Sequence, residues 1–264
     1  MIRLVCIDVD GTLVGSSGTV LPQIWDAVDR LRSKGVRLAI CSGRPAFGRA
    51  REYAARMDAQ GWHVFQNGAS VLHLATGESL SATLPLEAVA RLVDRSRETQ
   101  RVLELYSDAE YAVESHGRFA REHAGLLGVP FAPRPFDSLA GAVVRAQWMV
   151  PHDETDTVLS EPHPGLDAMA SSSPVMPDTT FVNFTRAGVG KASGVRSVAE
   201  GYGFALAQVM FVGDSGNDVA AMREVGMPVA MGNAEPDVTD VARMHVGHVD
   251  DGGLAEALTF ALTG

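Results

Sequence analysis

The sequence contains only two cysteines and has no long hydrophobic run. Cys6 and Cys41 each end a short apolar stretch, where a free cysteine usually packs as a small hydrophobe. Two cysteines form neither a disulfide framework nor a thiolate metal cluster, so we assign no role to either. The first apolar stretch, Leu4 to Ile7, lacks a basic leader and is far too short to span a membrane. We therefore expect a cytoplasmic protein without a membrane partner.

Basic residues are fewer than acidic ones, and nearly all of them are arginine. The net charge is −10, and Lys34 and Lys191 are the only lysines. With no run of Lys or Arg, nucleic acid is a poor candidate partner, whereas a small anionic substrate needs only local cations. Lys34 fits a solvated helix end. Lys191 is expected to start a helix, where a cation is unfavourable unless an anion lies nearby.

The two ends of the chain alternate between expected strands and helices. Strands are expected at 3–9, 36–41, 62–66, 209–213 and 227–231, and helices at 21–34, 46–60, 191–203, 217–225, 235–241 and 252–262. Buried strands separated by helices favour a parallel sheet with right-handed crossovers. This pattern predicts one doubly wound α/β domain built from residues 1–83 and 187–264.

The middle of the chain has a different pattern, typical of an α+β insert over residues 84–186. Helices are expected at 86–99, 117–127 and 154–160, and strands at 102–106, 111–114, 142–150 and 180–185. Proline and glycine punctuate the stretches between them, which marks loops.

Two aspartates one residue apart follow the first strand, in Asp8-Val9-Asp10-Gly11-Thr12-Leu13. On a strand, residues i and i+2 point the same way, so both carboxylates are expected on one side. At about 4 Å and an effective dielectric near 20, such a pair repels by roughly 4 kcal/mol. A cation or a proton would relieve the repulsion. An acidic turn that caps a helix would contain the same residues.

Other polar groups are expected at the same edge, because ligands of open α/β sheets bind beyond the carboxyl ends of the strands. These groups are Ser42-Gly43-Arg44, Lys191 and Gly213-Asp214-Ser215-Gly216-Asn217-Asp218. Each alone has an ordinary structural explanation, but together they predict a phosphate-handling site. A nucleotide-binding P-loop is excluded, since that pattern needs glycine at Thr185 and serine or threonine at Ala192.

These four motifs resemble those of the haloacid dehalogenase-like superfamily of aspartate-dependent phosphohydrolases. Further segments resemble its Cof-type phosphatases: Cys41-Ser42-Gly43-Arg44-Pro45, Gln66-Asn67-Gly68-Ala69, Gly188-Val189-Gly190-Lys191 and Ala230-Met231-Gly232-Asn233-Ala234. The resemblance implies a Rossmann-like core with a mobile cap domain inserted between the second and third motifs.

The resemblance also implies roles for individual residues. Asp8 would be the nucleophile that becomes an aspartyl-phosphate. Asp10 would act as general acid and base, which requires burial and a neighbouring carboxylate to raise its pKa. Asp8, Asp214 and the backbone carbonyl of Asp10 would hold Mg²⁺, and Asp218 would orient a water on the ion or bind it directly. Hard oxygen ligands suit Mg²⁺ better than zinc.

The phosphoryl group is expected to contact Ser42 and Lys191, which would stabilise its charge in the transition state. Gly43, Arg44, Asn67 and Asn217 are predicted to bind substrate, although Arg44 would equally suit a solvated ion pair. Cap candidates for specificity are Arg145, Gln147, Glu114, His116 and Asn183. Each of these five also fits an ordinary strand or surface position.

The sequence therefore predicts a Mg²⁺-dependent phosphatase acting on a small phosphomonoester such as a sugar phosphate. The insert has more Asp and Glu than Arg and no Lys, which disfavours polyphosphates. A phosphosugar mutase of the same superfamily is the main alternative, because the core motifs do not separate the two reactions. A non-catalytic phosphometabolite-binding protein is the third. The chain is expected to be a monomer or homodimer.

Overall fold

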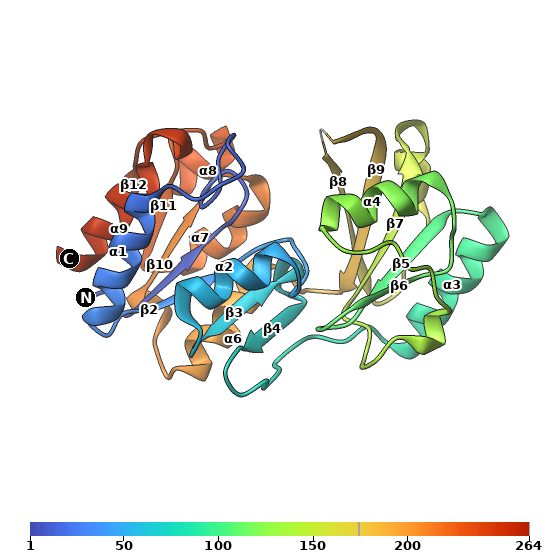
Figure 1. Ribbon diagram of the computed structural model, residues 1–264, viewed down its shortest axis with the longest axis horizontal. Coiled ribbons are helices and arrows are strands. Elements are labelled where there is room, and N and C mark those ends of the chain that lie inside the picture. The colour runs from blue at the N-terminus through green and yellow to red at the C-terminus, as the bar shows by residue number, and fades with distance from the viewer. Residues whose placement is uncertain (174, 264) are drawn as a thin grey trace. The chain divides into compact units, whose positions relative to one another are not determined.

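The computed structural model describes residues 1–173 and 175–263 (Figure 1). They form two compact units, each with its own sheet and hydrophobic core. The core unit comprises residues 1–44, 50–80 and those from 190 onwards. The insert unit comprises residues 45–49 and 81–189.

A five-stranded sheet in which every strand pair is parallel forms the centre of the core unit, in the order β12-β11-β10-β1-β2. The strands are β1 (Leu4–Ile7), β2 (Arg37–Ile40), β10 (Val209–Gly213), β11 (Met227–Ala230) and β12 (Met244–His245). All four residues of β1 are buried, as expected for a central strand covered on both faces. The doubly wound α/β fold predicted from the sequence is confirmed.

Helices cover this sheet. They are α1 (Pro22–Ser33), α2 (Arg49–Asp58), α6 (Lys191–Gly201), α7 (Val219–Glu224), α8 (Pro236–Val241) and α9 (Gly253–Thr263). Side chains of α6, α7 and α8 share one hydrophobic cluster with residues of β1, β2 and β10. Helices α1 and α9 pack against each other (Figure 1).

The helices of the core unit begin and end within three residues of their predicted bounds, and two of the differences have an identifiable cause. Helix α2 begins at Arg49 rather than Ala46, because Gly48 has a left-handed φ of 58° that a right-handed helix cannot include. The predicted helix over 217–225 is a 3₁₀ turn at Gly216–Asp218 followed by the short α7. Asn217 and Asp218 therefore lie in a turn.

A separate two-stranded antiparallel sheet pairs β3 (Trp62–Phe65) with β4 (Ser70–His73), and a 3₁₀ turn over Gln66–Gly68 joins them. The isolated parallel bridge between Cys41 and Val64 connects β3 to the chain after β2. Strand β4 was not among the expected elements, although its turn contains Asn67-Gly68, a pair typical of hairpin turns. Gln66 and Asn67 in this turn both have left-handed φ values.

The insert unit is α+β, as predicted. Its antiparallel sheet has the order β6-β5-β7-β9-β8. The strands are β5 (Val102–Tyr106), β6 (Tyr111–Val113), β7 (Arg145–Pro151), β8 (Leu166–Ser173) and β9 (Met176–Arg186), and the helices are α3 (Leu86–Thr99), α4 (Arg118–Leu127) and α5 (Thr155–Ser160). Helices α3 and α5 pack around Trp148 on one face, and α4 packs near Phe181 on the other.

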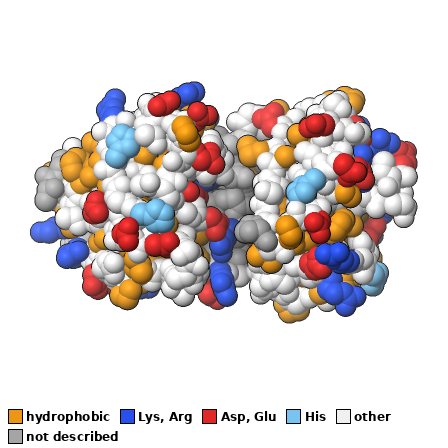
Figure 2. Space-filling model, turned by 90° about the horizontal axis from the view of Figure 1, so that it is seen from above, with side chains coloured by type: hydrophobic (Ala, Val, Ile, Leu, Met, Phe, Trp, Pro, Cys, Tyr) orange, Lys and Arg blue, Asp and Glu red, His pale blue; other side chains and the backbone are white. Residues whose placement is uncertain are grey.

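The sequence analysis also missed β8, an edge strand whose residues are mostly exposed. Its sequence, Leu166 to Ser173, ends in three serines and lacks the apolar alternation of a half-buried strand. Figure 2 shows acidic side chains on the surface of each unit, in keeping with the net charge of −10. Among the described residues, every helix is too short or too polar to cross a membrane.

Candidate active site

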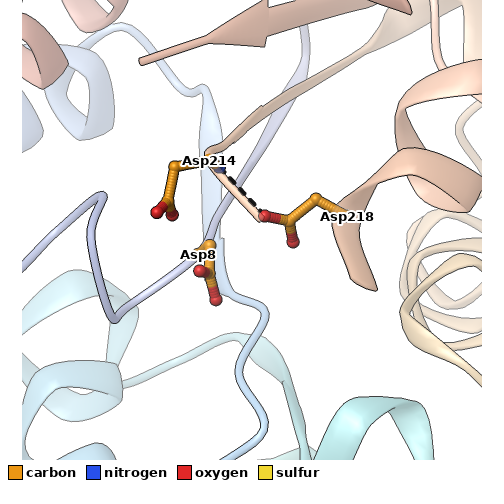
Figure 3. Close-up of side chains that lie close together, drawn as sticks. All are labelled: Asp8, Asp214 and Asp218. Atoms are coloured by element: carbon orange, nitrogen blue, oxygen red, sulfur yellow. Dashed lines mark hydrogen bonds between the residues drawn. The ribbon is translucent and has the colours of Figure 1, made fainter. Parts of the chain in front are cut away.

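Three carboxylates gather at the carboxyl edge of the core sheet. Asp8 follows β1, Asp214 follows β10, and Asp218 lies at the turn before α7. One oxygen from each lies within 4.8 Å of the others, and Figure 3 shows the three side chains converging. Adjacent parallel strands produce this grouping: the amide of Asp8 donates to the carbonyl of Val212 at 3.0 Å. Parallel pairing thus brings together residues more than 200 positions apart.

Lys191, the first residue of α6, lies among these acids. Its Nζ is 2.7 Å from Oδ1 of Asp8 and 2.6 Å from Oδ1 of Asp218, and its side chain is 1% exposed. Burial lowers the pKa of Lys191, but the attraction of Asp8 and Asp218 outweighs it and the net pKa is raised. The lysine therefore remains charged over the physiological pH range.

The cluster contains three carboxylates but one ammonium group, so two negative charges are in excess when all are ionised. Burial raises the pKa of Asp8 well above its usual range, although Lys191 opposes this shift. Burial likewise raises the pKa of Asp214 to about 6, against a hydrogen bond from Thr12. A divalent cation would neutralise this excess and keep the carboxylates ionised.

The oxygens of the cluster differ in their existing partners. Oδ2 of Asp218 accepts from the backbone amides of Asp214 and Ser215 at 3.0 and 3.1 Å, while Oδ1 accepts from Lys191. Asp218 therefore fixes the loop that presents Asp214. Asp8 and Asp214 remain as hard oxygen donors, and this set fits Mg²⁺, which prefers a few carboxylates and retains several waters.

Asp10 lies apart from this cluster. Its side chain is 61% exposed and forms an ion pair with Arg44, whose Nε donates to Oδ2 at 2.9 Å. The expectation that Asp10 is buried beside Asp8 is therefore wrong. Strand β1 ends at Ile7, and Asp10 belongs to a turn in which Gly11 has a φ of 82°. The i, i+2 rule for strands does not apply in such a turn.

The turn after β1 packs closely against Asp214. A Cβ at Gly11 would lie 2.1 Å from Oδ2 of Asp214, so only glycine fits there. Thr12 donates from Oγ1 to Oδ1 of Asp214 at 2.9 Å, and Nδ2 of Asn233 donates to the carbonyl of Gly11 at 2.8 Å. Thr12 and Asn233 were not predicted as site residues, although both lie within the segments that resemble the family's motifs.

The other predicted substrate-binding residues lie around Ser42. Ser42 is fully buried, and its Oγ accepts from the backbone amide of Arg44 at 3.1 Å. Gly43 approaches Asn67 closely, since a Cβ there would lie 3.1 Å from Oδ1 of Asn67. Asn67 and Asn217 contact each other, with Nδ2 of Asn217 donating to Oδ1 of Asn67 at 3.1 Å.

The cap candidates lie within the insert unit. Nη1 of Arg145 donates to Oδ1 of Asn183 at 3.0 Å, and its guanidinium stacks 4.0 Å from the ring centroid of Tyr106. Gln147 donates to the buried Glu104, 3.3 Å away, which also contacts His123 at 2.8 Å.

The remaining two candidates are at the surface: Glu114 pairs with Arg97 at 3.1 Å, and His116 is exposed. Glu104 and His123 were not predicted, because no local pattern shows that a strand and a helix will bring them together.

Comparison with known proteins identifies the class. The family model described as haloacid dehalogenase-like hydrolase matches residues 5–258, and the chain belongs to this family. In Bacillus subtilis (strain 168), a relative named "Putative phosphatase YxeH" is 26% identical over 98% of this chain and 97% of its own length. A second B. subtilis relative, the 5-amino-6-(5-phospho-D-ribitylamino)uracil phosphatase YcsE, is 25% identical over 97% of this chain and 94% of its own.

The fold has close counterparts among solved structures. A haloacid dehalogenase-like hydrolase from Bacteroides thetaiotaomicron superposes with a TM-score of 0.86 at 24% identity, covering 98% of this chain and 99% of that chain. The subclass IIB sugar phosphatase BT4131 superposes with a TM-score of 0.80 at 22% identity over 98% of each chain. At these identities, the likeness is one of fold.

Proposed function

We propose that this haloacid dehalogenase-like phosphatase hydrolyses a small phosphomonoester through an aspartyl-phosphate on Asp8, in a Mg²⁺-dependent reaction. One observation supports this above the others: the buried Asp8 lies at the end of β1, 2.7 Å from the buried ammonium of Lys191 and beside Asp214. A buried carboxylate with an adjacent fixed cation is suited to attack a phosphoryl group whose negative charge would otherwise repel it.

In the first step, a carboxylate oxygen of Asp8 attacks phosphorus, and the bond to the ester oxygen breaks. The leaving oxygen takes a proton from the carboxyl group of Asp10. In the second step, Asp10 takes a proton from a water molecule that attacks the phosphorus of the aspartyl-phosphate. The bond to Asp8 then breaks, and inorganic phosphate leaves.

Asp10 must leave Arg44 to perform these steps. Its side chain is 61% exposed, so it can rotate without opening a cavity in the core. Exposed ion pairs contribute only about 0–1 kcal/mol, so the cost of separating the pair is small. We propose that the Arg44 guanidinium then binds the phosphoryl group, because it matches phosphate and carboxylate oxygens equally well.

Lys191 and Ser42 would contact the phosphoryl oxygens, with the backbone at Gly43 nearby. Asp8, Asp214 and the backbone carbonyl of Asp10 would hold Mg²⁺, which when bound draws negative charge from the phosphoryl oxygens. Asp218 keeps the Asp214 loop and the Lys191 ammonium in place through its three hydrogen bonds.

For the substrate class, we propose a phosphorylated sugar or polyol. The name of the relative YcsE describes a phosphatase of a phosphoribityl compound, which is such an ester. We propose that residues 84–186 act as a cap and that the polar residues on one face of its sheet distinguish substrates. Arg145, Gln147 and Asn183 occupy that face, because they are register partners or alternate residues on β7 and β9.

The test is a screen of phosphorylated metabolites, measuring inorganic phosphate release with and without Mg²⁺. Phosphomonoesters of sugars or polyols should be hydrolysed only with the metal, and Asp8→Asn should lose at least about 10³-fold in kcat. Isomerised sugar phosphate without phosphate release would instead indicate a mutase. Unchanged turnover in Asp8→Asn would remove Asp8 as the nucleophile.

A further inference from the structure

Three consecutive residues in the turn between β3 and β4 have left-handed backbone conformations. Gln66, Asn67 and Gly68 have φ values of 52°, 54° and 93°. Most L-residues disfavour this region, glycine and to a lesser degree asparagine being the exceptions, so consecutive occurrences that include Gln66 require enforcing contacts. Such strain tends to accumulate at functional sites, so the contacts that enforce this conformation indicate its purpose.

Residues 66–68 support the turn formed by Ser42, Gly43 and Arg44, which is the proposed phosphoryl-binding turn. The backbone amide of Gln66 donates to the carbonyl of Arg44 at 2.9 Å, and that of Asn67 donates to the carbonyl of Ser42 at 3.0 Å. Both bonds require the amides of residues 66 and 67 to point back toward the turn, which the left-handed conformation permits. The positions of Ser42 and Gly43 therefore depend on this segment.

The same segment packs against the start of α6. A Cβ at Gly68 would lie 2.0 Å from the carbonyl oxygen of Gly190, so the two backbones are in direct contact. Lys191 follows Gly190 and provides the ammonium group beside Asp8. The turn that contains Ser42 and the helix that begins at Lys191 therefore both contact residues 66–68.

A chain of side-chain hydrogen bonds extends this support to the loop after β10. Oγ of Ser215 donates to Oδ1 of Asn217 at 2.9 Å, and Nδ2 of Asn217 donates to Oδ1 of Asn67 at 3.1 Å. Ser215 follows Asp214 directly. The Asn67 amide therefore lies between the Ser42 turn and the loop that presents Asp214 and Asp218.

We propose that Asn67 is a positioning residue that sets the spacing between the phosphoryl-binding turn and the acidic loop, acting through Asn217 rather than by contact with substrate. The inference rests on the proposed phosphatase function. A misplacement of about 1 Å between reacting groups lowers rates by up to about 100-fold. Loss of the hydrogen bond between Asn67 and Asn217 should therefore lower kcat more than it changes KM.

The experiment separates the backbone of Asn67 from its amide. Asn67→Gly retains the left-handed conformation and removes only the amide, and Asn217→Ala removes the same hydrogen bond from its other end. With p-nitrophenyl phosphate and Mg²⁺, each variant should lose about 10-fold in kcat with KM within a factor of three. The double variant should lose no more than either single one, because both remove one interaction.

Gln100→Gly is the matched control. Gln100 ends α3 with a φ of 58°, so the change also places glycine at a left-handed position, but in the insert unit, whereas the acidic cluster belongs to the core unit. Its kcat should equal that of the wild type.

Additive losses in the double variant, or wild-type kcat in Asn67→Gly, would overturn the positioning role while leaving the phosphatase assignment intact. A rise in KM confined to Asn67→Gly would show direct substrate contact instead. Absence of Mg²⁺-dependent turnover in the wild type would count against the phosphatase assignment itself.

Discussion

The guanidinium of Arg44 binds the carboxylate of Asp10 through two of its nitrogens, with Nε donating to Oδ2 at 2.9 Å. The two side chains are 34% and 61% exposed, so water competes with this pair. Asp10, the proposed acid and base of the reaction, is therefore held outside the buried cluster by Arg44, from which a phosphoryl group can displace it.

If Arg44 exchanges the carboxylate for the phosphoryl group, Arg44→Gln should weaken phosphate binding more than folding. We expect KM and the inhibition constant of inorganic phosphate to rise about 10-fold, because one bidentate contact is lost. The free energy of unfolding should change by less than about 1 kcal/mol. Steady-state kinetics and urea denaturation measure both. Arg44→Lys keeps the charge but not the planar guanidinium, so its KM should lie between those of the wild type and Arg44→Gln. An unchanged KM in Arg44→Gln would contradict the exchange.

The acid and base role of Asp10 can be separated from the nucleophilic role of Asp8 with a good leaving group. Asp10→Asn should still form the aspartyl-phosphate from p-nitrophenyl phosphate, since p-nitrophenolate needs no proton to depart. Breakdown of that intermediate needs a base and should slow by about 10²-fold or more. Stopped-flow measurements should therefore show a burst of p-nitrophenolate, one per enzyme, before slow turnover. No burst and a uniformly slow reaction would disprove this assignment.

Removal of the Lys191 ammonium should affect both stability and activity. Lys191→Met leaves Asp8 and Asp218 buried without their cation, and breaking such a pair costs about 3–5 kcal/mol. Its kcat should fall by about 10²-fold or more through lost charge stabilisation. Lys34→Met is the matched control, because Lys34 is exposed at the end of α1. A stable and active Lys191→Met protein would show that the buried ammonium has neither function.

Mg²⁺ should stabilise the folded protein, because the carboxylate cluster carries excess negative charge. At 100 times its dissociation constant, a ligand adds about 2.7 kcal/mol, which thermal unfolding detects as a higher Tm. Asp214→Asn should abolish most of that increase. Asp94→Asn, which removes an exposed carboxylate of the insert unit, should leave it intact. An equal Mg²⁺ effect in both variants would place the ion elsewhere.

Stability should fall on acidification because of His63. Burial lowers the pKa of this side chain to about 4, while its Nδ1 accepts from the amide of Ile40 at 3.1 Å. Because the folded-state pKa is the lower one, its contribution is complete above about pH 6.5 and is lost as the pH falls toward 4. Between pH 7 and 5 we expect it to account for a loss of about 2 kcal/mol.

Urea denaturation at several pH values measures this loss. His63→Gln removes the titrating group and should flatten the dependence by that amount. His116→Gln, at an exposed position, should retain the wild-type slope. Equal slopes in wild type and His63→Gln would exclude this histidine as the cause.

The sequence by itself determined the core architecture and the components of the acidic cluster. Alternation of buried strands and helices specifies a parallel sheet, and a parallel sheet places every strand end at one edge. Asp8 and Asp214 directly follow adjacent strands and therefore had to converge, despite their separation along the chain. Asp218 joins them from the turn before α7, and Lys191 joins them from the first turn of α6. Helix α3 and strand β5 also match their predicted bounds, because strong apolar periodicity or a β-rich run defines them.

The tertiary structure alone decided where side chains point in the turns that follow the strands. In a turn, side-chain direction follows from individual backbone angles rather than from a fixed period, so Asp10 points to Arg44 instead of joining Asp8. The contact between Asn67 and Asn217 joins residues 150 positions apart, and the left-handed angles of the 66–68 segment depend on the neighbours that enforce them. Strand β8 escaped prediction for a related reason: its pairing with β9, rather than its own sequence, makes it a strand.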